Sequence, residues 1–214
     1  MKTESAKSIL AKAIMAGFMI GVGGIVYLLV ENKYLGSFLF CFGLFTIIQY
    51  GFSLYTGKVG YIPERKPIYL REVALTLIGN VFGTAICSGM LRLTRAWDKV
   101  HSSAILIMDT KSNDSILSSF VLAVFCGLMM YLAVENSRAS KEKNNFVAAI
   151  FGTALPVMLF ILCGFNHSVA DSFYFFAASP NLSGVVYLLV AVLGNALGGM
   201  LVPLIKKAFD KPEN

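Results

Sequence analysis

Six long uncharged runs constrain the fold of this sequence of 214 residues. No Asp, Glu, Lys or Arg occurs in residues 13–30, 34–57, 73–91, 115–134, 144–170 or 182–205. Each run is close to or above the roughly 18–20 residues that a helix needs to cross a bilayer. Only 14% of the residues are charged and 57% are hydrophobic, unlike an ordinary soluble domain. We therefore predict an all-α integral membrane protein with six transmembrane helices, forming a single domain over residues 1–214.

The distribution of positive charge predicts the orientation of these helices. Six crossings place both termini on one side of the membrane. Of the 18 basic residues, that side carries Lys2, Lys7, Lys12, Lys58, Arg65, Lys66, Arg71, Arg138, Lys141, Lys143, Lys206, Lys207 and Lys211. The other side carries only Lys33, Arg92, Arg95, Lys99 and Lys111. Because cytoplasmic loops are enriched in Lys and Arg, we expect a multi-pass protein of the cell membrane with both termini in the cytoplasm. The basic residues form no single patch, so no nucleic-acid partner is expected.

A repeated pattern predicts two related halves. Gly79-Asn80-x-x-Gly83 in the third run recurs as Gly194-Asn195-x-x-Gly198 in the sixth. Since each half contains three helices, the second half must cross the membrane in the opposite sense, which is the pattern of an inverted repeat. We expect halves of approximately 8–93 and 115–207, joined by a polar loop. Small residues and Asn at these positions favour close helix packing with hydrogen bonds across the contact.

The middle helix of each half is expected to be broken. In the second run, Thr56, Gly57 and Lys58 interrupt an apolar stretch that resumes at Val59. In the fifth run, small and polar residues surround His167. Broken helices are tolerated in a membrane where the freed backbone groups line a cavity. The alternative is an ordinary helix end followed by an interfacial aromatic stretch.

His167 is the most informative candidate residue. An ionisable side chain within an apolar segment indicates a functional site, and histidine can exchange a proton near neutral pH. The four cysteines, Cys41, Cys87, Cys126 and Cys163, lie in predicted helices and are expected to be apolar fillers. Cys163 and His167 alone are too few ligands for a structural metal site. We expect no metal and no cofactor.

Several motifs together resemble the formate/nitrite transporter family over nearly the whole chain. They are Ala16-Gly17-Phe18-Met19-Ile20-Gly21, Leu54-Tyr55-Thr56-Gly57, Lys111 before the fourth helix, Gly164-Phe165-Asn166-His167-Ser168-Val169-Ala170, and Gly194-Asn195-x-x-Gly198-Gly199. The resemblance implies an aquaporin-like fold, a homopentamer surrounded by membrane lipid, and a pore for small monovalent anions in each protomer.

The resemblance also implies roles for individual residues. Phe40, Leu44 and Phe160 match one apolar constriction, and Leu54 and Tyr55 match a second. Thr56 matches a residue that faces the histidine, and Lys111 matches a lysine of the outer vestibule. The alternatives are that the apolar residues are plain core and that Lys111 is an ordinary interfacial lysine.

Other positions are candidate modulators or departures from the family pattern. Asp171 and Gly127 stand where the family commonly has Asn, and Lys58 stands where a neutral residue is frequent. Asn166 precedes His167 directly. One turn after His167, Asp171 either favours the charged imidazolium or caps the second piece of the broken helix. His101, in the polar loop, is expected to be solvated.

We predict a channel or transporter for small monovalent anions, with formate as first choice and nitrite or hydrosulfide close behind. His167 either donates a proton to the substrate or only donates a hydrogen bond. The alternative function is a channel for neutral solutes such as water or ammonia, although the Asn-Pro-Ala signatures of aquaporins do not occur. An enzyme is not expected, because Ser168 lacks a matched base and orienting acid.

Overall fold

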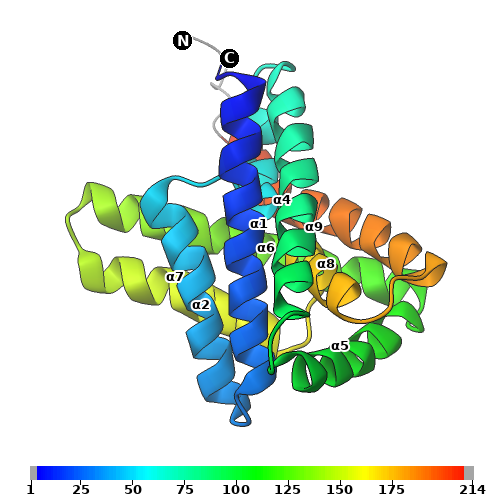
Figure 1. Ribbon diagram of the computed structural model, residues 1–214. Coiled ribbons are helices and arrows are strands. Elements are labelled where there is room, and N and C mark those ends of the chain that lie inside the picture. Colours follow the sequence, from blue (N-terminus) through cyan, green and yellow to red (C-terminus); the bar gives the residue numbers. More distant parts are fainter. Residues whose placement is uncertain (1–3, 210–214) are drawn as a thin grey trace.

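The computed structural model describes residues 4–209, and these residues form helices and connections without a strand (Figure 1). The helices are α1 (Ala6–Leu29), α2 (Lys33–Tyr50), α3 (Tyr55–Lys58), the 3₁₀ helix η1 (Val59–Glu64), α4 (Tyr69–Leu91), α5 (Trp97–Ser112), α6 (Ile116–Glu142), α7 (Phe146–Leu162), α8 (Ser168–Ala177) and α9 (Leu182–Phe209). Lys2 and Lys211, which we used to predict the orientation, lie outside the described residues.

Five of these helices are long and apolar enough to span a membrane: α1, α2, α4, α6 and α9. Helix α7 is also apolar but shorter. The prediction of an all-helical protein with several membrane-spanning helices is therefore confirmed.

The second and fifth uncharged runs each contain a helix end. Helix α2 stops at Tyr50 and α3 starts at Tyr55, whereas α7 stops at Leu162 and α8 starts at Ser168. A glycine follows each stop, and Gly51 and Gly164 have φ angles of 66° and 69°. This left-handed conformation suits glycine and ends a helix.

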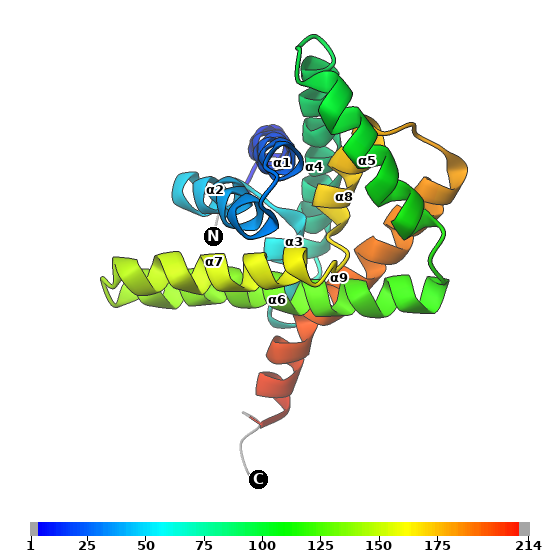
Figure 2. The ribbon, with the colours of Figure 1, turned by 90° about the horizontal axis from the view of Figure 1, so that it is seen from below.

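The same helix pairings occur in the two parts of the chain. Helix α1 packs on α4 and α2, and α6 packs on α9 and α7. Figure 1 shows α1 and α4 side by side, and Figure 2 shows α6 beside α7. The short helices α3 and α8 lie inside, where they contact helices from both parts.

Backbones approach closely where the repeated Asn residues cross a partner helix. A Cβ atom at Gly127 of α6 would overlap the carbonyl oxygen of Asn195 on α9. In the other pair, a Cβ atom at Gly17 of α1 would overlap the carbonyl oxygen of Asn80 on α4. Gly127, which departs from the family pattern, is thus required by the α6–α9 crossing.

The segment between the two parts differs from our expectation. We predicted a polar loop, but residues Trp97–Ser112 form α5, which packs against α8 (Figure 2). Val100, Ala104 and Met108 are buried on one face of this helix. Their spacing of four is a helical signal that the high polarity of the segment masked.

Gly127→Ala tests the close crossing. We expect it to lower the free energy of unfolding by about 1–3 kcal/mol, because overpacking forces the helices apart. Thermal unfolding of purified protein in detergent is the measurement. Gly89→Ala on α4 is the matched control, since a Cβ atom there meets no atom within 4 Å. The better helix propensity of Ala should make that variant equally or more stable, and equal losses in both variants would contradict the crossing argument.

Candidate functional site

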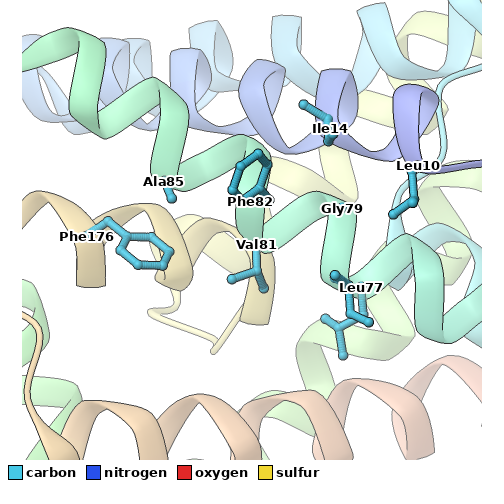
Figure 3. Close-up of a pocket in the computed structure, with 9 residues that line it drawn as sticks. Leu10, Ile14, Leu77, Gly79, Val81, Phe82, Ala85 and Phe176 are labelled. Carbon is cyan, nitrogen blue, oxygen red and sulfur yellow. The ribbon is translucent and has the colours of Figure 1, made fainter. Parts of the chain in front are cut away.

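A groove of about 780 Å³ lies against α1 and α4, and the described residues that line it are all apolar. Figure 3 shows Leu10 and Ile14 of α1 and Phe176 of α8 around it, together with side chains of α4. A groove of this kind offers no polar group to an ion. The candidate site therefore lies elsewhere, among the buried polar residues around His167.

Asn80 on α4 holds the break between α2 and α3. The backbone N–H of Tyr55 donates to Asn80 Oδ1 at 2.7 Å. The Asn80 amide nitrogen donates to the carbonyl oxygens of Ala13 and Ser53, both at 2.8 Å. Asn80 is fully buried, so its side chain takes the place of water for backbone groups that the break leaves free.

Asn195 on α9 holds the break between α7 and α8 in the same way. The backbone N–H of Ser168 donates to Asn195 Oδ1 at 2.9 Å. The Asn195 amide nitrogen donates to the carbonyl oxygens of Ala123 and Asn166, both at 2.8 Å. The hydrogen bonds across helix contacts that we predicted are confirmed, whereas the support of the two breaks was not foreseen.

His167 is the N-cap of α8. Its Nδ1 atom accepts a hydrogen bond of 2.9 Å from the backbone N–H of Ala170. A nitrogen that accepts carries no proton, so the proton of the neutral ring is on Nε2. Nε2 lies 3.0 Å from Thr56 Oγ1 and donates to it. Because the Thr56 oxygen accepts this bond, the hydroxyl hydrogen of Thr56 is free to point to a substrate.

Apolar side chains flank this histidine. Phe160 of α7 stacks on the imidazole, with ring centroids 5.2 Å apart and an interplanar angle of 21°. Phe40 of α2 meets Phe160 edge-on at 6.0 Å, and Leu44 is buried on the same helix. Leu54 and Tyr55, at the start of α3, are also buried. The structure thus brings both predicted apolar sets to the region of Thr56 and His167.

Lys111 binds other side chains of the protein. Its Nζ atom lies 2.7 Å from Asn166 Oδ1, 3.3 Å from the Asp171 carboxylate and 3.3 Å from the Tyr187 hydroxyl. Tyr187 in turn donates to Asp171 Oδ2 at 2.6 Å. These four side chains, Lys111, Asn166, Asp171 and Tyr187, form what we call the lysine cluster. They come from α5, the α7–α8 connection, α8 and α9.

Two sequence-based expectations change in the structure, and Lys58, a departure from the family pattern, has a charged partner. The cap of α8 is the His167 side chain and not Asp171, whose carboxylate is bound by Lys111 and Tyr187. His101 is not simply solvated: its Nδ1 atom donates to the Ala177 carbonyl oxygen at 2.7 Å, and its ring stacks on Trp97. Lys58 is paired with Glu72 of α4.

Tyr187 is the functional candidate that sequence reasoning missed. It lies eight residues before Asn195 on α9, which places both side chains on one helix face. That spacing was the available signal. Among the described residues no group of three or more His, Cys, Asp or Glu side chains could hold a metal ion. Cys41, Cys87 and Cys126 are buried as expected for fillers, but Cys163 follows the end of α7 and is exposed.

Comparisons with known proteins agree with this geometry. A family model described as "Formate/nitrite transporter" matches residues 2–207. A formate-nitrite transporter of Plasmodium falciparum is 27% identical over an alignment of 234 residues, with 91% of this chain and 75% of the relative covered. A probable formate transporter of Methanothermobacter thermautotrophicus is also 27% identical, with 90% and 85% covered. The fold is similar to that of a pentameric formate channel with formate bound, with a TM-score of 0.80, 21% identity and coverage of 95% and 96%.

Asn195→Ala tests the support of the break before α8. It removes hydrogen bonds to three buried backbone groups, so we expect the free energy of unfolding to fall by about 2–4 kcal/mol. Asn145→Ala is the control, because Asn145 caps α7 with one exposed hydrogen bond, whose loss costs about 1 kcal/mol. Thermal unfolding in detergent compares the two variants. Equal small losses would show that Asn195 does not support the break.

Proposed function

Because the chain belongs to the formate/nitrite transporter family, which comprises transporters and not enzymes, we propose that it conducts small monovalent anions across the cell membrane. Formate is the first candidate, since curated relatives carry the names "Probable formate transporter" and "Formate channel". Nitrite and hydrosulfide have the same charge and similar size, and they remain the next candidates.

One observation carries this proposal: the buried contact between Thr56 and His167, at the point where two short helices begin. A small anion at this point would meet the free hydroxyl hydrogen of Thr56, and His167 could donate its Nε2–H to the anion once that N–H leaves Thr56. Phe40, Leu44 and Phe160 on one side, and Leu54 and Tyr55 on the other, serve as the apolar constrictions. A charged ion crosses such constrictions at a high solvation cost, so the polar pair between them lowers the barrier.

The proposed channel has six crossings. Helix α2 with α3 and η1 forms the second crossing, and α7 with α8 forms the fifth. The halves, approximately 8–93 and 115–207, are then related as an inverted repeat with an aquaporin-like arrangement in one domain over 1–214. Support comes from the matching pairings α1–α4 and α6–α9 and from the matching roles of Asn80 and Asn195. Both termini lie in the cytoplasm.

We place this protomer in a homopentamer within the lipid bilayer. The outer helix faces carry many exposed apolar side chains, among them Phe42, Phe82, Leu155, Leu189 and Leu193. Such faces need either lipid or another protomer to cover them. The solved channel with a similar fold is described as pentameric, which favours five copies.

The cap of α8 bears on the mechanism. His167 can donate a hydrogen bond through Nε2 while Nδ1 keeps its bond to Ala170. A doubly protonated ring has no acceptor nitrogen, so it would lose that bond. Proton transfer from an imidazolium therefore requires the cap to open in each cycle. The hydrogen-bond mechanism needs no such opening, and we favour it.

Transport assays test function and mechanism together. We expect proteoliposomes with the native protein to take up formate faster than nitrite or hydrosulfide, and His167→Asn to retain part of the flux, because Asn can still donate a hydrogen bond. Uptake is measured at several pH values. The pH dependence should be similar in both proteins if His167 only donates a hydrogen bond.

The contrary outcomes are distinct. If folded His167→Asn retains a flux that no longer varies with pH as that of the native protein does, His167 acts as a proton donor. If the native protein passes water or ammonia but no anion, the protein is a channel for neutral solutes.

Phe160→Ala tests the apolar constriction. Removing the ring that stacks on His167 should widen the path and raise the uptake of acetate relative to formate by about tenfold, since one such contact discriminates by 1–3 kcal/mol. Phe151→Ala is the control on the same helix, because Phe151 is 57% exposed on the outer face. An equal acetate-to-formate ratio in both variants would remove Phe160 from the constriction.

A further inference from the structure

The lysine cluster uses every hydrogen-bond donor of Lys111. A lysine ammonium group has three N–H donors, and Nζ lies within reach of three partners: Asn166, Asp171 and Tyr187. The Lys111 side chain is 15% exposed and that of Asp171 is 3% exposed. An anion that reaches this lysine therefore finds no vacant donor, and one existing partner must leave before it can bind.

The distances from Lys111 Nζ show which of its partners are held least tightly. Two hydrogen bonds of the cluster are short: Lys111 Nζ lies 2.7 Å from Asn166 Oδ1, and the Tyr187 hydroxyl lies 2.6 Å from Asp171 Oδ2. Lys111 Nζ lies 3.3 Å from both the Asp171 carboxylate and the Tyr187 hydroxyl, farther than the 2.7–2.9 Å of a strong charge-assisted bond. Tyr187 can keep its bond to Asp171 when the lysine releases it. Asn166 is itself fixed, because its amide nitrogen donates to the Ser119 carbonyl oxygen. Exchange is thus easiest on the side of Lys111 that faces the Asp171–Tyr187 pair.

The charges of Lys111 and Asp171 cancel within the pair. Besides Lys111 and Asp171, the titratable groups near the pair are Cys126 of α6, Tyr174 of α8, Tyr187 of α9 and His167. Thiol and phenol groups are uncharged near neutral pH, and the hydrogen bond that His167 Nδ1 accepts assigns the neutral form of its ring. Asp114 acts on Tyr187 from the α5–α6 connection, where its carboxylate binds Ser115 and Ser118. The empty site consequently lacks the uncompensated positive charge that a lysine alone would provide.

We propose that Asp171 determines the charge selectivity of the pathway: its carboxylate neutralises Lys111 in the empty channel, and a permeant anion binds by displacing it. This inference rests on the proposed function as an anion channel. The consequence is weak capture and rapid release of anions, and a smaller disadvantage for neutral molecules. A carboxamide at position 171 would keep the shape of the cluster and leave Lys111 with its full charge.

Four proteins test the proposal: the native protein, Asp171→Asn, Lys111→Gln and the double variant. Each is reconstituted from a monodisperse preparation, and formate uptake is measured against formate concentration at about 10 mM and 150 mM impermeant salt. Asp171→Asn should lower the half-saturating formate concentration about tenfold at low salt, since an uncompensated charge raises local anion concentration by 10-fold or more. Screening over a shorter Debye length should reduce this gain at high salt.

The order of the variants separates charge from structure. Lys111→Gln leaves the Asp171 carboxylate without its positive partner and should raise the half-saturating formate concentration. The double variant carries no charge and should fall between the two single variants. Asp109→Asn, an exposed acid on α5 two residues before Lys111, makes the same change of net charge outside the cluster and should leave formate uptake unchanged.

Three results would overturn the proposal. The first is an unchanged half-saturating concentration in folded Asp171→Asn. The second is a double variant that equals Asp171→Asn, which would mean that the charge of Lys111 does not attract the anion once Asp171 is removed. The third is an equal shift in Asp109→Asn, which would assign the effect to overall charge. In each of these cases the native protein still transports formate, whereas a native protein that transports no anion refutes the proposed function itself.

Discussion

Two buried asparagine side chains support the rest of this structure. Hydrocarbon supplies no hydrogen bonds, so a helix that breaks within a membrane must find partners for its free backbone groups inside the protein. Asn80 and Asn195 each bind one N–H group and one carbonyl oxygen at the α2–α3 or α7–α8 connection, and one carbonyl oxygen of the neighbouring helix α1 or α6. Because these bonds fix where α3 and α8 begin, they also fix Thr56 and His167. The polar centre of the protein depends on them.

His167 combines two tasks that constrain one another. As the cap of α8 it offers the lone pair of Nδ1 to Ala170, and as a partner of Thr56 it offers the proton of Nε2. Each task requires the same tautomer, so the local fold prepares the ring for its contact. Phe160 stacks on one face of the imidazole and limits its rotation. The ring is thus oriented by the backbone on one edge and by an aromatic neighbour on its face.

The sequence predicted those features that depend on local pattern. The helices follow from uncharged runs, and the helix end near Gly164 follows from the small and polar residues before His167. The end of α2 at Tyr50 was not predicted, because we expected the interruption at Thr56, Gly57 and Lys58, which are helical residues of α3. The contact of Thr56 with His167 was anticipated from family resemblance alone. The pairing of Lys111 with Asp171 was not anticipated, because the two residues are 60 positions apart and meet only when α5 folds back onto α8. No local period encodes a contact of that kind, and α5 itself was hidden by its polarity.

Helix α5 connects the two parts of the chain, and it also contacts both ends of α8 in the second part. His101, near its start, binds the carbonyl oxygen of Ala177 at the end of α8, and Lys111, near its end, binds Asp171 in the first turn of α8. The part of α5 from His101 to Lys111, about 15 Å long, thus packs along α8. The connection is therefore a structural member of the second half, so a chain divided between α4 and α6 could keep both halves intact and still lose its central site. Repeating the helix pairing of the first part would not by itself build this site, because the joining segment supplies Lys111.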